Sequence, residues 1–323
     1  HASDGGGSIR TPAHCCGVFG LKPSRGRNPV GPQQFGGPFG YGVHHVSTRS
    51  VRDSAAFLDV LHGDEPGAWY RAPPPARHFA QEVGADPGRL RIAFSSASPS
   101  PFATSPECVA AVEEAARLFE SLGHHVEEAA PCYDWEAFRS AFNDNWVAGV
   151  PYRIAHLESL LGFRIGPEHL EPCNWVNLQY ARSMTLEHHQ RSMARLSALT
   201  REVESFFQHW DVLLTPVNRG PANRLGVLSP DLAFEGTLGY WDRICAGVGP
   251  YLPIFNANGQ PAMSVPFTTS AEGLPIGIHC VTRFGDEAAL LRLASQIESA
   301  RPWAHRRPPV HVADPATQGP AVL

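Results

Sequence analysis

Apolar side chains recur at helical spacing in two segments, residues 51–61 and residues 286–299. In the first segment they are Val51, Ala55, Leu58 and Leu61, and in the second Leu290, Leu291, Leu293 and Ile297. Ser50 stands ahead of the first segment as a candidate N-cap, and Gly63 follows it as a stop signal. This spacing predicts two amphipathic helices, each with one face buried against a core.

Short apolar runs bounded by turn residues predict strands between such helices. They occupy residues 90–94, 212–216, 262–265 and 276–281, and a further strand starts at Val126. Between the first strand and Val126, Ser105 and Pro106 open a helix that runs to Leu122, with serine as the N-cap and proline in the first turn. The strand, helix, strand order predicts a βαβ unit and hence an α/β fold.

Residues 134–207 differ from the rest of the chain, because they combine long helical patterns with many aromatic side chains and few strand signals. We expect a helical region there. Residues 302–323 are rich in proline and arginine and predict an extended tail. No internal repeat is evident.

Composition narrows the classes of partner and cofactor. The 323 residues carry a net charge of −5, which provides no basic surface for nucleic acid, and no apolar run approaches the roughly 18 residues of a membrane-spanning helix. The seven cysteines are odd in number and lack C-x-x-C spacing, so we expect reduced thiols, a cytoplasmic protein, and neither a metal site nor a cofactor.

Three consecutive glycines, Gly5, Gly6 and Gly7, lie between Asp4 and Ser8. Glycine is costly to order, and backbone without Cβ atoms can turn several N–H groups toward one negatively charged oxygen. Ser8 reads as the N-cap of a following helix that ends at Gly17, and no strand-forming run precedes the glycines. The segment fits an oxyanion hole beside a serine nucleophile, while an ordinary glycine-rich turn or a phosphate loop remains open as the alternative. A Walker-type loop is disfavoured because no Gly-Lys-Ser/Thr follows.

The run SDGGGSIRTPAHCCGVFGLKPSRGR at residues 3–27 resembles the signature of the amidase signature family of serine hydrolases. Further similar runs are TRSVRDSAAFLDVLHG, NANGQPAMSVP and PIGIHCVTRFGDEAALLRLASQIE, so the resemblance spans nearly the whole chain. Within the family, the resemblance is strongest to the branch that contains 6-aminohexanoate cyclic-dimer hydrolase and related amidases. Two segments carry this similarity, HVSTRSVRDSAA and DPGRLRIAF.

The resemblance implies a mixed central sheet surrounded by helices, in a single domain that covers residues 1–323. It implies that Ser8 is the nucleophile and that the amides of Gly5, Gly6, Gly7 and Ser8 form the oxyanion hole. Family members use a Ser-cisSer-Lys triad whose lysine and second serine lie ahead of the glycines. Because the chain starts three residues before Asp4, we expect an N-terminal portion with both groups to be missing.

Lys22 is the only lysine in the sequence and thus the only local candidate for the base. A buried lysine can have its pKa lowered enough to accept a proton. However, Lys22 matches a lysine of the family's GLKP segment that lies outside the triad, which favours a structural role.

Other site candidates rest on the resemblance as well. Asp4 and Arg10 flank the glycines with opposite charges, and in the family such residues brace the loop. In the family, the region equivalent to residues 134–207 largely sets specificity. There we consider Asn143, Trp146 and Tyr152 as pocket residues, with helix packing as the competing interpretation. Cys245 is a further pocket candidate and not a nucleophile.

The sequence therefore predicts an amide-bond hydrolase that acts by acyl transfer on small linear or cyclic amides. Two alternatives stay open: the glutamine-dependent amidotransferase component that releases ammonia from glutamine, and a non-catalytic fragment without the catalytic lysine. We expect a small-molecule amide substrate, no nucleic acid or membrane partner, and a homodimer as the candidate assembly.

Overall fold

The computed structural model describes residues 1–31, 40–231, 235–308 and 310. Its strands are β1 (Ala2–Asp4), β2 (Phe19–Lys22), β3 (Val43–His45), β4 (Ser47–Thr48), β5 (Arg91–Phe94), β6 (His125–Glu128), β7 (Val212–Pro216), β8 (Ala262–Thr269) and β9 (Pro275–Val281). Its helices are α1 (Arg10–Cys16), α2 (Val51–Leu61), α3 (Pro106–Ser121), α4 (Trp135–Val147), α5 (Val150–Leu161), α6 (Pro172–Ser183), α7 (Leu186–Phe206), α8 (Gly236–Gly247), α9 (Ile254–Ala257) and α10 (Glu287–Ala300), with 3-10 turns η2 (Phe79–Glu82) and η3 (Pro167–His169).

Within the described residues, seven strands form a mixed sheet in the order β4-β2-β8-β9-β7-β5-β6. The pairs β5·β6 and β5·β7 are parallel, as the predicted βαβ unit requires, and the other neighbours are antiparallel. β1 and β3 form a separate antiparallel pair. The expectation that no strand precedes the glycines is wrong. A strand of three residues is too short to show a periodic pattern, and its partner lies 41 residues further along the chain.

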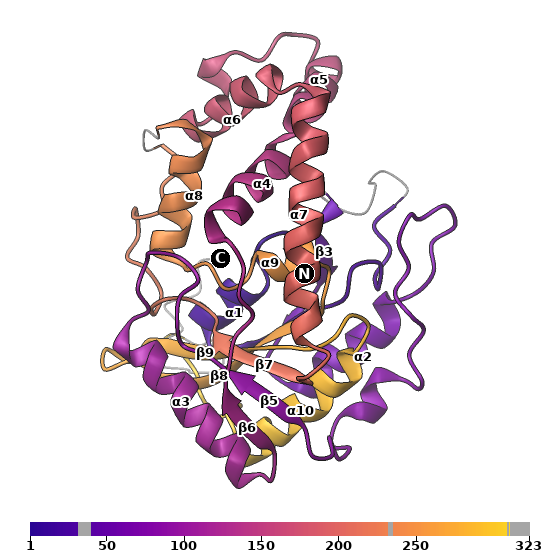
Figure 1. Ribbon diagram of the computed structural model, residues 1–323, viewed down its shortest axis with the longest axis vertical. Coiled ribbons are helices and arrows are strands. Elements are labelled where there is room, and N and C mark those ends of the chain that lie inside the picture. Colours follow the sequence, from indigo (N-terminus) through magenta and orange to yellow (C-terminus); the bar gives the residue numbers. More distant parts are fainter. Residues whose placement is uncertain (32–39, 232–234, 309, 311–323) are drawn as a thin grey trace, which may run out of the picture.

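Alternating strand residues supply two hydrophobic cores, one on each face of the sheet. On β7, Val212 and Leu214 pack with α2, α3 and α10, whereas Leu213 packs with α4, α7 and α9. In Figure 1, α3 and α10 lie along one side of the sheet, while α4, α6, α7 and α8 extend away from the other side to α5 at the far end. This second group of helices contains the expected helical region at 134–207.

Three of the predicted helix-end signals, Ser50, Ser105 and Gly17, are confirmed. Ser50 caps α2 by accepting the amide of Asp53 at 3.1 Å, and Ser105 accepts the amide of Cys108 at the start of α3. Gly17 ends α1 in the left-handed conformation, with φ of 65°. Beyond α10, Trp303 is buried and its indole N–H donates to the carbonyl of Arg49. Residue 309 and residues 311–323 of the predicted tail fall outside the described residues.

All seven cysteines lie in described parts of the chain and are free thiols. Among the described helices, none is long and apolar enough to cross a membrane. The described residues also contain no group of three or more His, Cys, Asp or Glu side chains that could hold a metal ion.

Candidate active site

The glycine segment forms an irregular loop between β1 and α1, and Ser8 is exposed at its end. The expectation that Ser8 caps the helix is wrong, because α1 begins at Arg10 and its N-cap is Ile9, which makes no side-chain cap bond. Residues 8 and 9 instead form a turn ahead of the helix. The Ser8 side chain is therefore not committed to the role of an N-cap.

Gly7 has a backbone conformation that requires glycine. Its φ is +132°, and a Cβ built on it would lie 2.7 Å from Cδ1 of Leu252. Either feature alone would strain another residue at this position. The last glycine before Ser8 is thus fixed by both backbone geometry and packing.

The Asp4 carboxylate holds the loop from inside. Its side chain is fully buried, and it accepts the amide of Gly7 at 2.6 Å and the amide of Ile9 at 3.2 Å. The chain between these residues is therefore folded around one carboxylate, with Ser8 between the two bonded amides. An amide that donates to Asp4 is not free to stabilise an oxyanion, so the predicted oxyanion-hole role of Gly7 is corrected.

The remaining loop amides fit the predicted role better. In the described part of the chain, the amides of Gly5, Gly6 and Ser8 donate to no protein acceptor. Gly5 and Gly6 precede the bonded amide of Gly7 in the loop, and Ser8 follows it. These three N–H groups are available to a developing negative charge on a bound substrate.

Arg10 pairs with Asp4 through two hydrogen bonds, from Nε and Nη2, each 3.0 Å long. Neither side chain is exposed. Burial alone would raise the pKa of Asp4, but the Arg10 guanidinium and its hydrogen bonds hold that pKa well below its usual value. The carboxylate is therefore ionised at neutral pH, as a bidentate buried pair requires. Asp4 and Arg10, the two oppositely charged residues predicted to flank the glycines, therefore form an ion pair.

Asn256 completes this pair and was not among the predicted site residues. Its Oδ1 accepts Arg10 Nη2 at 2.6 Å, and its Nδ2 donates to the carboxylate and the carbonyl of Asp4. The signal was present, because Asn256 opens the NANGQPAMSVP run. Local patterns could not show that this run reaches the glycine loop.

Three aromatic side chains from α4 and α8 pack against the loop. A Cβ on Gly5 would lie 3.1 Å from Cζ3 of Trp146, and a Cβ on Gly6 would lie 3.8 Å from Phe142 and 4.0 Å from Trp241. The three rings contact one another with centroid separations of 5.2–5.9 Å. We call Phe142, Trp146 and Trp241 the aromatic wall. The predicted residue Trp146 belongs to it, whereas Phe142 and Trp241 were not selected from the sequence.

The other pocket candidates lie elsewhere. Asn143 is buried between α4 and α8, where its Nδ2 donates to Thr237 Oγ1. Cys245 is 2% exposed in the core, and burial raises the pKa of its thiol to about 12. Tyr152 is 75% exposed on α5, at the end of the helical region far from α1. The structure brings none of these three to the loop.

Lys22 is fully buried at the end of β2, where its Nζ donates to the carbonyl of Pro23 at 3.0 Å. Burial, followed by the nearby Arg10 charge, lowers the pKa of its ammonium group well below the usual value. Ser8 is exposed, whereas Lys22 lies inside the protein on a strand of the sheet. This placement fits a structural side chain and not the base for Ser8.

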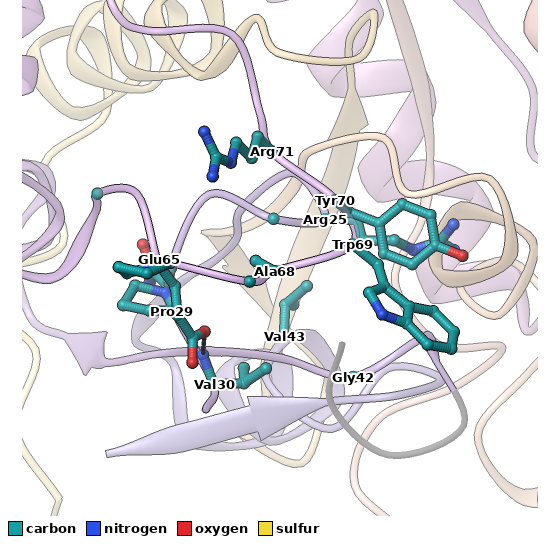
Figure 2. Close-up of a pocket in the computed structure, with 15 residues that line it drawn as sticks. Arg25, Pro29, Val30, Gly42, Val43, Glu65, Ala68, Trp69, Tyr70 and Arg71 are labelled. Carbon is teal, nitrogen blue, oxygen red and sulfur yellow. Dashed lines mark hydrogen bonds between the residues drawn. The ribbon is translucent and has the colours of Figure 1, made fainter. Parts of the chain in front are cut away.

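A cavity of about 180 Å³ is lined by residues from three segments, 25–30, 42–43 and 63–71, and Figure 2 shows its lining. The Arg25 guanidinium lies over the ring of Tyr70, and Glu65 accepts the amide of Val30. Arg25 Nη2 also donates to the carbonyl of Asn256 at 2.7 Å. The cavity therefore shares one support with the glycine loop, but residues 4–8 do not line it.

Comparison with known proteins settles the family. Residues 1–291 match the family model described as amidase. The chain belongs to the amidase family. Among curated amidase-family relatives, the 6-aminohexanoate-cyclic-dimer hydrolase of Paenarthrobacter ureafaciens is 33% identical over 99% of this chain, and that of Pseudomonas sp. (strain NK87) is 34% identical over 99%. The chain spans 66% of the length of each.

A solved structure of 6-aminohexanoate cyclic dimer hydrolase superposes on this amidase-family chain with a TM-score of 0.86 at 33% identity. The superposed region covers 95% of this chain and 65% of the chain in the solved structure. The resemblance read from the sequence and the predicted fold class, a mixed central sheet surrounded by helices, are both confirmed.

Proposed function

We propose that the protein hydrolyses amide bonds through an acyl intermediate on Ser8. One observation carries the proposal: an exposed serine ends a glycine loop whose conformation is held by the buried pair of Asp4 and Arg10. A loop fixed in this way can present its amides to a charge without reorganising during the reaction. The names of the hydrolase relatives support the same reaction class.

The reaction would proceed in two steps. Ser8 Oγ attacks the amide carbonyl carbon, and the carbonyl oxygen becomes an oxyanion held by the amides of Gly5, Gly6 and Ser8. Collapse of this intermediate breaks the C–N bond, and the amine leaves with a proton. Water then attacks the acyl-enzyme and releases the carboxylic acid, which frees Ser8.

The proton of Ser8 needs an acceptor, and the placement of Lys22 does not suit that role. We therefore propose that the acceptor is a lysine acting through a second serine, as the family resemblance implies, and that residues outside these 323 supply both groups. Such a pair would pass the serine proton to the leaving amine.

For the substrate, we propose small linear or cyclic amides. The aromatic wall places apolar rings beside Gly5 and Gly6, and the partly exposed ring of Trp146 suits the methylene chain of an aliphatic amide. The 6-aminohexanoate cyclic dimer is the first substrate to test, because the two relatives named above are hydrolases of that compound by name.

The test is labelling by a fluorophosphonate probe, followed by peptide mass mapping. The complete product of the gene and the 323-residue chain are compared, with Ser8→Ala in each as the control. We expect the complete product to be labelled at Ser8 and the Ser8→Ala variant to remain unlabelled. Labelling of the 323-residue chain as well would place the acceptor within it, and absence of labelling in both forms would contradict the proposal.

We also propose that the enzyme acts in the cytoplasm, which the seven free thiols support. The homodimer stays a prediction, and sedimentation of the complete product would test it.

A further inference from the structure

His279 lies under the glycine loop and links it to the middle of the sheet. It is fully buried on β9. Its Nε2 is 3.1 Å from Arg10 Nη1, and its Nδ1 is 2.9 Å from Thr215 Oγ1. The imidazole of His279 thus connects Arg10, which pairs with Asp4, to Thr215 on β7.

The chemistry of these contacts fixes the tautomer of the ring. An arginine side chain only donates hydrogen bonds, so Nε2 of His279 must be the acceptor and the ring must be neutral. Nδ1 then carries the proton and donates to Thr215, whose hydroxyl donates in turn to the carbonyl of Pro216 at 3.1 Å. Burial, then the Arg10 charge, lowers the pKa of His279 well below its usual value, in agreement with a neutral ring.

The ring is held by the most enclosed part of the sheet. β9 lies between β8 and β7, and His279 is opposite Ser264 on one neighbour and Thr215 on the other. The ring of Phe255 also packs on it, with centroids 5.6 Å apart. Because the ring is fixed relative to the sheet on several sides, it can hold its hydrogen-bond partner Arg10 in a fixed position relative to the sheet.

Arg10 is therefore fixed from two directions. Nε and Nη2 face Asp4, while Nη1 faces His279 and the carbonyl of Leu252, which is 3.3 Å away. Without the imidazole acceptor, Nη1 would keep only the longer contact to the carbonyl of Leu252, while Nε and Nη2 would still face Asp4. The guanidinium would then be held less tightly, and so would the Asp4 carboxylate that accepts the amide of Gly7.

We infer that His279 is a positioning residue for the nucleophile, whose Nε2 holds Arg10 so that Asp4 sets the amides on either side of Ser8. This inference rests on the proposed function for its effect on acylation. Its effect on the loop itself can be measured in the absence of any activity.

Three substitutions in the complete gene product separate the contacts of the ring. In His279→Gln, the amide oxygen of glutamine can accept the hydrogen bond from Arg10. In His279→Asn, the shorter side chain can reach only Thr215. In His279→Met, methionine fills similar space without an acceptor. A charge-assisted hydrogen bond corresponds to roughly 10–100-fold in rate. We expect His279→Met and His279→Asn to lower the acylation rate or kcat by about that factor with little change in KM, and His279→Gln to recover most of it.

Hydrogen exchange of the Gly7 and Ile9 amides is the second measurement. We expect faster exchange at both in His279→Met, unchanged exchange in α7, and recovery in His279→Gln. The inference is overturned if exchange at the loop is unaltered in His279→Met, or if the Gln variant behaves like the Met variant. If exchange changes as expected but the wild-type protein is never acylated, the proposed function fails and the positioning role stands.

Discussion

Oδ1 of Asp4 lies 2.6 Å from the amide nitrogen of Gly7, and this contact turns one of the four predicted oxyanion donors inward. The bond closes a tight bend in which Gly5 and Gly6 are the only intervening residues. Their amides, with that of Ser8, have no protein acceptor among the described residues. The buried carboxylate thereby determines which loop amides are available.

Gly7→Ala should damage the loop far more than Gly6→Ala. At Gly7 the new Cβ meets Leu252 at 2.7 Å and φ is +132°, whereas at Gly6 the nearest atom is an ordinary 3.8 Å away. Strain of this kind costs about 1–3 kcal/mol. Urea unfolding and probe labelling of Ser8 measure the two effects. Equal losses in the two variants would mean that the conformation of Gly7 is not critical.

Asp4→Asn should lower the free energy of unfolding by about 3–5 kcal/mol, because the Arg10 charge would remain buried without its counter-ion. Asp53→Asn is the matched control. Its ion pair with Arg52 is exposed, with 79% of the Arg52 side chain accessible, and such pairs contribute at most about 1 kcal/mol. Chemical denaturation of both variants is the measurement. A similar small loss in each would argue against a stabilising role for the buried pair.

Lys22→Met should leave acylation of Ser8 in the complete gene product largely unchanged. The methionine fills the same buried space and removes the bond from Nζ to the Pro23 carbonyl, together with the electrostatic interaction between the amine and Asp4. The measurement is the rate of fluorophosphonate labelling, compared with Ser8→Ala. Loss of labelling in a folded Lys22→Met protein, judged by circular dichroism, would restore Lys22 as the candidate base.

Trp146→Leu should change the relative kcat/KM values for amides of different chain length, because its ring edge lies against Gly5. Tyr152→Ala is the control, since this side chain is 75% exposed on α5. A panel of linear and cyclic aliphatic amides measures both. If Trp146→Leu keeps the wild-type profile, the aromatic wall has no part in substrate selection.

Stability should fall on mild acidification, partly because of His45. Burial lowers the pKa of His45 to about 4, although a hydrogen bond to Ser54 and the charge of Glu287 oppose the shift. Between pH 6.5 and pH 4 the unfolded chain binds a proton at His45 that the folded chain does not, so stability rises with pH in this window and falls as pH decreases. From pH 7 to pH 5 the expected loss from His45 is about 2 kcal/mol.

Urea titrations at pH 7 and pH 5 test this dependence, with His45→Gln as the comparison because glutamine does not titrate. The variant should lose less stability than the wild-type protein over the same interval. An identical loss in both would assign the pH dependence to other groups, such as the buried His14, whose pKa burial also lowers.

Local patterns predicted the elements whose signals are local. Ser50 and the apolar repeat defined α2, and Ser105 with Pro106 defined the start of α3. The strand β1 was missed because three residues carry no period, and Ser8 was misassigned as a cap because a turn separates it from α1. Whether Ser8 is the nucleophile remains a prediction.

Only part of the support of the site could be read from the sequence. Asp4 and Arg10 are six residues apart, and their pairing was anticipated. Asn256 lies 252 residues from Asp4, and no periodicity or spacing rule connects positions so far apart. Only the folded sheet brings them together.

That separation also sets an order of events during synthesis. Ser8 and its glycines are among the first of these residues to leave the ribosome, yet Arg10 meets partners 246 and 269 residues later in the chain. Contacts of such high sequence separation form slowly and require most of the chain to be present. A stalled or shortened nascent chain would therefore display the serine beside a pair of Asp4 and Arg10 that lacks its contacts with Asn256 and His279, until β8 and β9 had closed the sheet.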